Sequence, residues 1–333
     1  MNEELIKQAL SFYGVKPVKI FPEQKGYRNK SFRIKTENRE DLNLIFYKSE
    51  AGILNRIKRA DELSEMAFLN NLPVRHLFDQ RILILRNSNR TTYARLYYYL
   101  PGTTIAWEMF SMNHMKLLGW AMSDLHFITK DSGVKLPLAT DELIEINERM
   151  RKYFSNNDIK TAMREKLGIS LNPRKDFETT LEQTARLETQ PLHLDLVRGN
   201  LLFKSTTKNN NSATWHISSS TLSGIIDFEK TAAGHPILDL ARSYAFLLVD
   251  VANKPPEKIF KYLIESGYQK RGQNKIDLDP KLFESLTNFF LTYDFFKFLR
   301  HNPYESLSEN HHFVRTRNLL IEKRVVKSTR NRR

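Results

Sequence analysis

Apolar runs in the first hundred residues predict a small sheet with one long helix. Continuous or alternating apolar residues favour strands at 18–23, 31–37, 42–48, 81–87 and 94–100. Between the third and fourth of these, an apolar spacing of three residues predicts a helix over 51–72, with Leu63, Met66, Leu69 and Leu72 on one face. A first amphipathic helix at the N-terminus is indicated by Leu5, Ile6, Ala9 and Leu10.

Beyond residue 100 the spacing of apolar residues changes from one typical of strands to one typical of helices. Helical spacing is shown by Met115–Leu118–Met122–Leu125, by Leu143–Ile146–Met150 and by Phe177–Leu181–Ala185. Two short strands, 200–203 and 224–228, interrupt these helices, and the polar stretch 204–223 between them predicts a hairpin with a mobile tip. Helices resume at 237. A strand-rich first lobe followed by a helix-rich second lobe is an α+β architecture.

The net positive charge of the chain introduces a second class of function to consider, nucleic-acid binding. The 52 Lys and Arg residues exceed the 38 Asp and Glu residues and give a formal net charge of +14. Six of these cations lie in an acid-free C-terminal stretch, 323–333, and without them the charge falls to +8. The other cations are scattered, so specific nucleic-acid binding is disfavoured and would involve only this basic tail; the favoured interpretation is a soluble surface with a mobile cationic end.

Composition also limits the chemistry and the location. The chain has 333 residues and no cysteine, which excludes disulfides, thiolate metal sites and a cysteine nucleophile. Its N-terminus has acids where a signal peptide needs basic residues, and its most apolar later stretches are interrupted by charges. We therefore expect a cytoplasmic protein with no membrane partner.

The motif with the most chemical content is HLDLVRGNLLF at 193–203, followed by GIIDFEK at 224–230. If the two strands pair, the hairpin brings Asp227 beside Asn200. Phosphoryl transfer needs oxygen ligands for Mg²⁺ and a carboxylate that orients the attacking hydroxyl. The pattern therefore predicts Asn200 and Asp227 as metal ligands and Asp195 as the group that addresses the acceptor hydroxyl.

These two segments, with GHPILDLA after them, resemble the aminoglycoside phosphotransferase and choline kinase superfamily of small-molecule kinases. The resemblance extends from about Gly26 to Leu248 and implies a protein-kinase-like fold of two lobes. It implies a nucleotide-binding lobe at 1–98, a hinge at 99–103, a helical catalytic and acceptor-binding lobe at 104–322, and the basic tail at 323–333. ATP and Mg²⁺ are the implied cofactors, and a small-molecule hydroxyl is the implied substrate.

Family roles carry over to the motif residues. Asp195 is implied as catalytic base, His193 as a residue that orders the loop, and Asp239 as one that holds it in place. The chain departs from the usual HGDLHPGN loop, because Leu194 stands where glycine is common and Val197 and Arg198 replace His-Pro. Leu194 is expected to narrow the approach to Asp195, and Arg198 to be able to contact an anionic group.

In the first lobe the resemblance implies a nucleotide site built from several segments. Lys48 is implied to contact the phosphates and Glu65 to pair with it, with Glu62 one turn away. Asn29 and Ser31, in a hairpin that begins near Gly26, are implied phosphate donors; because no Gly-x-Gly-x-x-Gly is present, a plain surface turn is the open alternative. Tyr99 and Pro101 flank Leu100 at the hinge, where adenine would bind.

Several alternatives remain open from the sequence. His126 is expected to be structural, and Glu229 is either a neighbour of the metal or a surface acid. The acids Asp141, Glu142, Glu145 and Glu148 form either a solvated helix face or part of an acceptor pocket. The leading hypothesis is a small-molecule kinase; the alternative is a catalytically silent nucleotide binder or scaffold whose tail engages RNA or another anionic partner. A protein kinase proper is disfavoured because HLDL lacks its arginine and no Asp-Phe-Gly follows.

Overall fold

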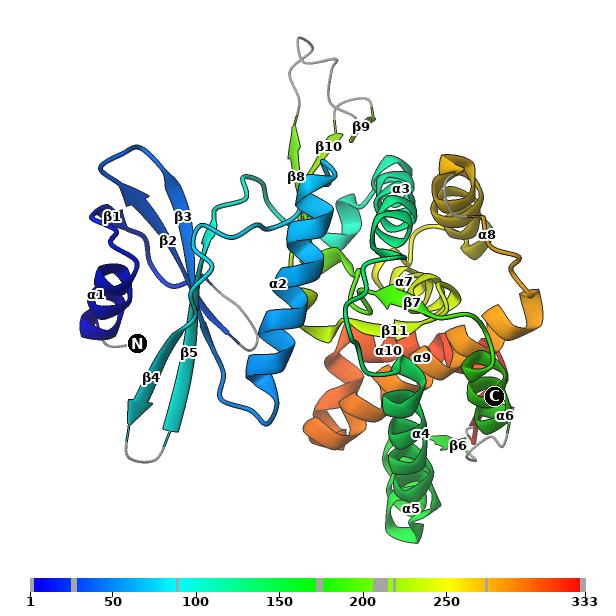
Figure 1. Cartoon of the computed structure of the whole chain (residues 1–333). Helices are drawn as coiled ribbons and strands as arrows, with labels where there is room; N and C mark the ends of the chain where they lie inside the picture. Colours follow the sequence, from blue (N-terminus) through cyan, green and yellow to red (C-terminus); the bar gives the residue numbers. More distant parts are fainter. Residues whose placement is uncertain are drawn as a thin grey trace.

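The computed structural model has two lobes, a sheet with its helix and a larger helical body (Figure 1). It describes residues 3–24, 29–87, 90–171, 176–205, 215–217, 220–272 and 275–329. The predicted α+β, two-lobed architecture is confirmed. The expected mobile tip of the second-lobe hairpin falls largely on 206–214 and 218–219, and Gly26 falls in 25–28, all outside the described residues.

The first lobe is a five-stranded antiparallel sheet in the order β1-β2-β3-β5-β4. Its strands are β1 (Pro17–Ile20), β2 (Lys30–Thr36), β3 (Asp41–Tyr47), β4 (Leu83–Asn87) and β5 (Arg90–Tyr98). Phe32, Leu44 and Leu96 are paired across the three central strands and therefore share one face. Helix α1 (Glu3–Phe12) covers this face with Ile6 and Leu10.

Helix α2 (Ile53–Leu69) belongs to the cores of both lobes. Ile53 and Ile57 pack against Tyr47 on the second face of the sheet. Farther along the helix, Ala60 and Leu63 are buried in the large core of the helical lobe. The helix accordingly stands between the two lobes (Figure 1) and packs on both.

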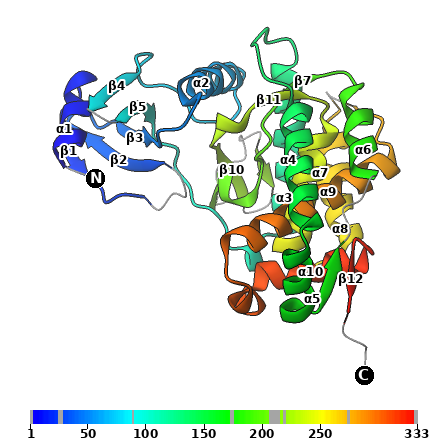
Figure 2. The ribbon, with the colours of Figure 1, turned by 90° about the horizontal axis from the view of Figure 1, so that it is seen from below.

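The second lobe is mainly helical and contains short strands (Figure 2). Its helices are η1 (Trp107–Met109), α3 (Met112–Thr129), α4 (Ala139–Ser155), α5 (Asn157–Leu167), α6 (Asp176–Ala185), η2 (Arg198–Asn200), η3 (Phe228–Lys230), α7 (Ile237–Asp250), α8 (Pro256–Phe260), the π-helix η4 (Lys261–Gln269), α9 (Pro280–His301), η5 (Tyr304–Glu309) and α10 (His311–Glu322). Its strands are β6 (Ile169–Leu171), β7 (Gln190–Leu192), β8 (Leu201–Ser205), β9 (His216–Ile217), β10 (Ser220–Ile225), β11 (Ala232–Gly234) and β12 (Val326–Ser328).

Two glycines permit the close approaches that shape this lobe. Gly102 has φ 136°, and a Cβ there would lie 2.3 Å from the Ser223 hydroxyl, so the hinge can run directly over β10. Gly119 lies in α3, where a Cβ would lie 2.2 Å from the carbonyl oxygen of Leu263. The π-helix therefore packs backbone to backbone on α3.

The C-terminal stretch differs from the expected free tail. Val325 and Val326 are buried, and β12 pairs antiparallel with β6, with Lys327 opposite Ser170. The expectation of a mobile cationic end is wrong for this segment, because two apolar residues and a strand ladder fix it to the fold. Residues 330–333 lie outside the described part. No helix in the described ranges combines the length and the apolar character needed to cross a bilayer.

Candidate active site

Asp195 lies in the loop between β7 and η2, and its side chain is buried. The Asn200 amide donates to the Asp195 carbonyl oxygen at 2.9 Å and to its carboxylate Oδ2 at 3.1 Å. The backbone N–H of Asp195 in turn donates to His193 Nδ1 at 3.2 Å. Burial lowers the pKa of His193, so its neutral ring can accept this bond. The loop thus folds back on itself and presents Asp195 and Asn200 together.

Asp239 on α7 anchors this loop through hydrogen bonds to its backbone. It accepts the backbone N–H of His193 at 2.9 Å and that of Leu194 at 2.7 Å. His126 Nε2 lies 3.0 Å from the same carboxylate, and His126 Nδ1 lies 2.9 Å from the Tyr268 hydroxyl. His126 is fully buried in this network, in agreement with its expected structural role.

Leu194 has a left-handed backbone conformation, with φ 57°. Such a φ disfavours a branched side chain by about 1 kcal/mol, which explains why glycine suits this position. Here the two backbone bonds to Asp239 enforce the conformation, and the Leu194 side chain is buried. The loop therefore keeps its hydrogen-bonded conformation, although its sequence departs from the usual one.

The predicted hairpin brings the second acidic motif to the loop. Strands β8 and β10 pair antiparallel with Leu201 opposite Ile225, and Ile226 N–H donates to the Asn200 carbonyl oxygen at 3.0 Å. Asp227 follows directly, at φ 68°, a conformation that aspartate tolerates better than most residues. The backbone of Asn200 and the Asp227 turn are therefore neighbours.

Glu229 lies beside Asp227 and is a buried residue rather than a surface acid. Arg75, which follows α2, donates from Nη1 to Glu229 Oε1 at 2.7 Å. Burial and then the neighbouring Glu229 carboxylate raise the pKa of Asp227 well above its usual range. Asp227 therefore sits in a negative environment that a cation would relieve.

Two cations that the sequence analysis missed contact Asp195. Lys230 Nζ lies 2.8 Å from Oδ2, and Arg242 Nη2 lies 3.1 Å from Oδ1. Burial opposes ionisation of Asp195, but these two cations outweigh it and lower its pKa to about 2. The only sequence signal for them was their place, since Lys230 follows Asp227 by three residues and Arg242 follows Asp239 by three.

In the first lobe the predicted phosphate residues lie together at one end of the sheet. Lys48 directly follows β3, its side chain is exposed, and its backbone N–H donates to Asn29 Oδ1 at 3.1 Å. The Ser31 hydroxyl lies 2.6 Å from Asn43 Oδ1 and 3.0 Å from Gln24 Oε1. Lys48 and Asn29 are thus adjacent, whereas the Ser31 hydroxyl is held within the sheet.

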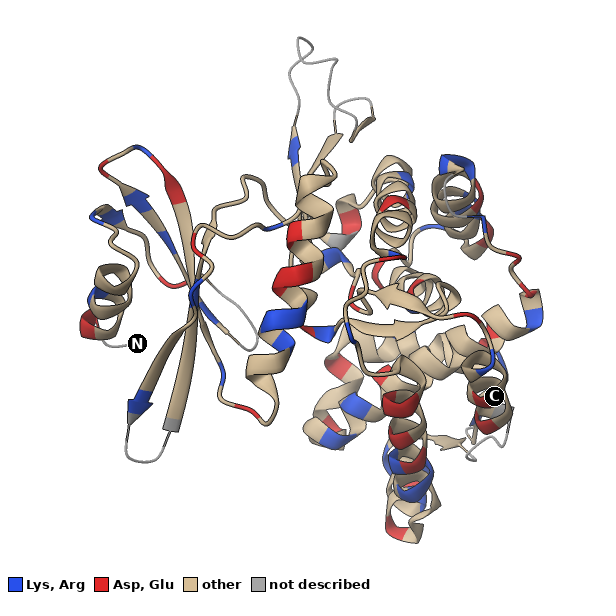
Figure 3. Ribbon diagram, in the orientation of Figure 1, with Lys and Arg blue, Asp and Glu red and all other residues tan. Residues whose placement is uncertain are grey.

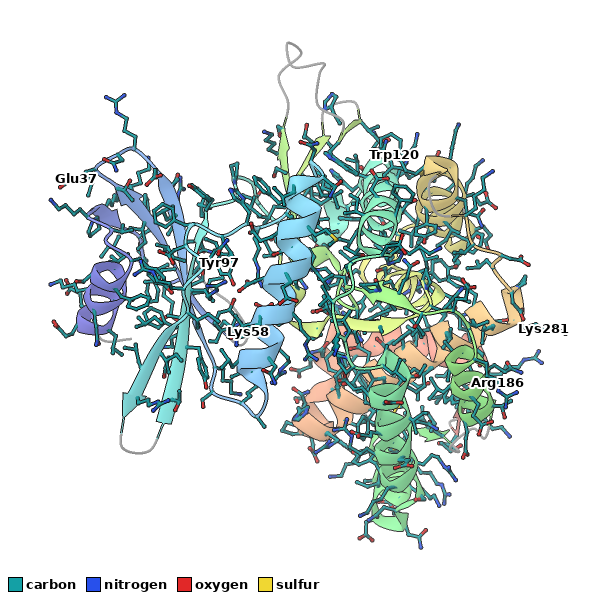
Figure 4. The ribbon with its side chains drawn as sticks, in the orientation of Figure 1. Glu37, Lys58, Tyr97, Trp120, Arg186 and Lys281 are labelled. Atoms are coloured by element: carbon teal, nitrogen blue, oxygen red, sulfur yellow. The ribbon has the colours of Figure 1, made fainter. Side chains whose placement is uncertain are left out.

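Glu65 does not pair with Lys48 in this structure. Its carboxylate accepts the backbone N–H of Leu77, and burial raises the pKa of this half-buried group. Glu62 is exposed on α2. A different acid of the helix is buried against the sheet: Asp61, which accepts from Arg95 at 2.6 Å and from the Tyr97 hydroxyl at 2.7 Å. Tyr97 lies between the sheet and α2 (Figure 4).

The hinge residues connect the sheet to the helical lobe. Tyr99 N–H donates to the Asp41 carbonyl oxygen at 2.8 Å, and the guanidinium of Arg33 lies 4.2 Å from the centre of the Tyr99 ring. Pro101 has no N–H. Among these hinge residues, Leu100 therefore has the backbone donor that could meet an adenine ring.

The acids on the α4 face do not form a metal site by themselves. The four acids of the α4 face are exposed, as on a solvated helix (Figure 3). Across the described ranges, no group of three or more His, Asp or Glu side chains is arranged to hold a metal. A kinase-type Mg²⁺ site needs fewer protein ligands, since phosphates and water supply the rest.

Comparison with known proteins decides the family. The profile of the phosphotransferase enzyme family matches residues 22–256. The chain belongs to this family. The match confirms both the resemblance of the motifs and the expected enzyme class, a small-molecule kinase. No curated protein matches the chain.

Solved structures confirm that the phosphotransferase has a kinase-like fold. An amicoumacin kinase, solved in complex with AMP-PNP, Ca²⁺ and Ami, has a TM-score of 0.69 at 14% identity, and the match covers 97% of this chain and 94% of that one. A microcompartment-associated aminopropanol kinase has a TM-score of 0.68 at 14% identity, with 97% and 98% covered. An ethanolamine kinase from Plasmodium vivax has a TM-score of 0.54 at 13% identity, with 95% and 88% covered.

Proposed function

We propose that this phosphotransferase is an ATP- and Mg²⁺-dependent kinase that transfers the γ-phosphoryl group to a hydroxyl of a small molecule. The observation that carries the proposal is the contact of Asn200 with Asp195, in a loop whose backbone also pairs with the segment leading to Asp227. A carboxylate for the hydroxyl and oxygen ligands for a metal are thereby held side by side, as phosphoryl transfer requires. The silent scaffold is disfavoured, because the family is enzymatic and Asp195, Asn200 and Asp227 are all retained.

Asn200 and Asp227 are the residues that would hold Mg²⁺. Their fit rests on the electrostatics of Asp227, whose raised pKa reflects burial and a nearby carboxylate. A bound divalent cation would favour the ionised form of this group. When bound, Mg²⁺ would supply neutralisation of the charge on the nucleotide phosphates.

Asp195 would orient the acceptor hydroxyl and receive its proton. A carboxylate can accept about four hydrogen bonds, and the Asn200, Lys230 and Arg242 side chains take up three positions, so an acceptor hydroxyl still has a place. Its low pKa makes Asp195 a weak base that remains ionised, which suits a reaction driven by alignment and charge neutralisation. Lys230 lies on the same oxygen as Asn200 and would stabilise the transferred phosphoryl group.

The nucleotide would bind between the hinge and the end of the sheet. Lys48 and Asn29 lie together there and would contact the phosphates, with Ser31 and Glu65 in supporting positions. Tyr99 and Pro101 would border the adenine. In this scheme Lys48 is free to turn toward a ligand because its side chain is exposed.

The test compares Asp195→Asn with Asp131→Asn, an exposed aspartate used as the control. Mg²⁺-dependent ATP turnover should fall at least a thousandfold in Asp195→Asn, while ATP binding measured by calorimetry changes less than threefold. EDTA should abolish turnover in the wild-type protein. Turnover close to wild type in Asp195→Asn would refute the role of Asp195.

A further inference from the structure

The two oxygens of the Asp195 carboxylate face different surroundings. Oδ2 contacts Asn200 and Lys230, the side on which the metal and the nucleotide phosphates would lie. Oδ1 contacts Arg242, which comes from helix α7. Because transfer is in line, the attacking oxygen approaches opposite to the leaving oxygen of the nucleotide. If the proposed function holds, Arg242 is therefore on the acceptor side.

Arg242 is built into this position. Its side chain is only 11% exposed, and its guanidinium carbon lies 5.7 Å from the ring centres of both Phe246 and Phe290. Its Nε is buried and has no hydrogen-bond acceptor in the part of the chain that the structure describes. A buried guanidinium with an unused donor, next to the catalytic carboxylate, is suited to an anionic partner.

The same surface continues along α7 and α9. One turn beyond Arg242, the ring of Phe246 lies 5.9 Å from Lys297 Nζ. The same Nζ lies 5.0 Å from the Tyr293 ring and pairs with Asp294 at 2.7 Å. Cations and aromatic rings thus alternate outward from Asp195. We call Arg242, Phe246, Tyr293 and Lys297 the acceptor wall.

Charge around the acceptor wall is net positive. His312 bonds Asp294 at 2.7 Å and lies 3.4 Å from Asp250; against the opposing effect of burial, these carboxylates raise the pKa of His312 to about 9. Asp250 also accepts from Arg198 at 3.3 Å. On the acceptor side, the connected cations are Arg242, Lys297, Arg198 and protonated His312, and the connected carboxylates are Asp195, Asp250 and Asp294. Four cations against three carboxylates leave one positive charge, the opposite of what would attract a polyamine.

We propose that the acceptor carries, besides its hydroxyl, a carboxylate or phosphate group that binds Arg242 and Lys297. This inference rests on the proposed function and narrows its substrate class to anionic hydroxy compounds. An incoming anion would share Arg242 with Asp195, and Phe246 and Tyr293 would line the carbon skeleton between the two cations.

Four hexoses that differ mainly in charge test the proposal: glucosamine, glucose, glucuronate and glucose 6-phosphate. Their binding is measured by calorimetry on the full-length protein with Mg²⁺ and a non-hydrolysable ATP analogue. At least one of the two anions should bind ten or more times tighter than glucose, and glucosamine no tighter than glucose. The tighter anion identifies whether carboxylate or phosphate is preferred.

Two variants test whether the anion binds at Arg242 and Lys297. Arg242→Gln should reduce anion binding at least tenfold. Since Arg242 also contacts Asp195, Lys297→Gln serves as the second variant and should weaken anion binding three- to tenfold without changing nucleotide binding. The matched control is Lys281→Gln, an exposed lysine at the start of the same helix α9 and at the edge of the molecule (Figure 4), which should change nothing.

Nucleotide binding and slow Mg²⁺-dependent ATP hydrolysis, measured on the same protein, report the proposed function separately. If both are present but glucosamine binds as tightly as the anions, or if none of the four sugars binds, the anionic acceptor is refuted while the kinase stands. Anion binding that is unchanged in both Arg242→Gln and Lys297→Gln would also refute it. Absence of nucleotide binding and hydrolysis would instead overturn the proposed function.

Discussion

The loop around Asp195 and the first-lobe residues proposed to bind the nucleotide are held in opposite ways. Around Asp195, the backbone is fixed by a buried carboxylate, Asp239, and by side-chain bonds from Asn200. At the end of the sheet, Lys48 is exposed, and Glu65 bonds a backbone N–H rather than Lys48. The loop is therefore organised without ligand, while Lys48, the proposed phosphate ligand, is not.

Because of this difference, substitutions in the two regions should differ in their effects on stability and on ligand binding. A buried polar network loses stability when one partner is removed, since the remaining groups stay desolvated and unpaired. An exposed lysine contributes little to stability, so changing it affects ligand binding alone. Stability and binding measurements on matched variants can therefore separate the two regions.

Asp239→Asn should have the largest effect on stability. The amide cannot accept the bonds from His193, Leu194 and His126 as the carboxylate does, so the free energy of unfolding should fall by about 3–5 kcal/mol. Urea unfolding measures this loss, and ATP turnover should fall with it. Asp277→Asn, at an exposed position, is the control. An equally stable and active Asp239→Asn protein would show that the loop does not depend on this anchor.

His312 gives the second-lobe network a pH dependence. Its pKa is raised from 6.5 to about 9, so its stabilising contribution is complete below pH 6.5 and is lost as the pH rises toward 9. The loss should be on the order of 2–3 kcal/mol between pH 6 and pH 9.5. Thermal or urea unfolding of wild type and His312→Gln over this range measures the difference. Parallel pH profiles for the two proteins would contradict the expectation.

Lys48→Met should weaken ATP binding about tenfold, equivalent to about 1.4 kcal/mol, because it removes a cation from the phosphates. The free energy of unfolding should change by less than about 0.5 kcal/mol, since the side chain is exposed. Lys16→Met, also exposed but outside the sheet, is the control. A large loss of stability with unchanged ATP binding would show that Lys48 has a structural role and does not bind the nucleotide.

Glu65→Gln should have the smallest effect. Glutamine can still accept the Leu77 N–H, so we expect less than a threefold change in ATP binding and a stability change within about 0.5 kcal/mol. If ATP binding instead falls as much as in Lys48→Met, Glu65 pairs with Lys48 in the nucleotide complex and the first lobe rearranges on binding.

Local patterns predicted the elements and part of the site. The strands at 42–48 and 94–100 and the helix over 51–72 were visible because their apolar residues follow the period of the structure they form. Pairing of β8 with β10 followed from two short apolar runs around a polar connection, and this register joins Asn200 to the segment before Asp227. Burial of Val326 in β12 was not visible, because three residues are too few to show a period and their partner strand β6 lies far away in the sequence.

The sequence by itself determined the order of lobes, and it predicted Asp195 as the reacting carboxylate with Asn200 and Asp227 as metal ligands, because these inferences depend on residue type at short spacing and on one hairpin. Only the tertiary structure decided which cations reach Asp195, which acid of α2 is buried and what charge the acceptor wall carries. Lys230 and Arg242 reach Asp195, and Lys297 reaches Phe246, across about 35 to 50 residues of chain, and such contacts depend on long-range geometry that local periodicity does not record.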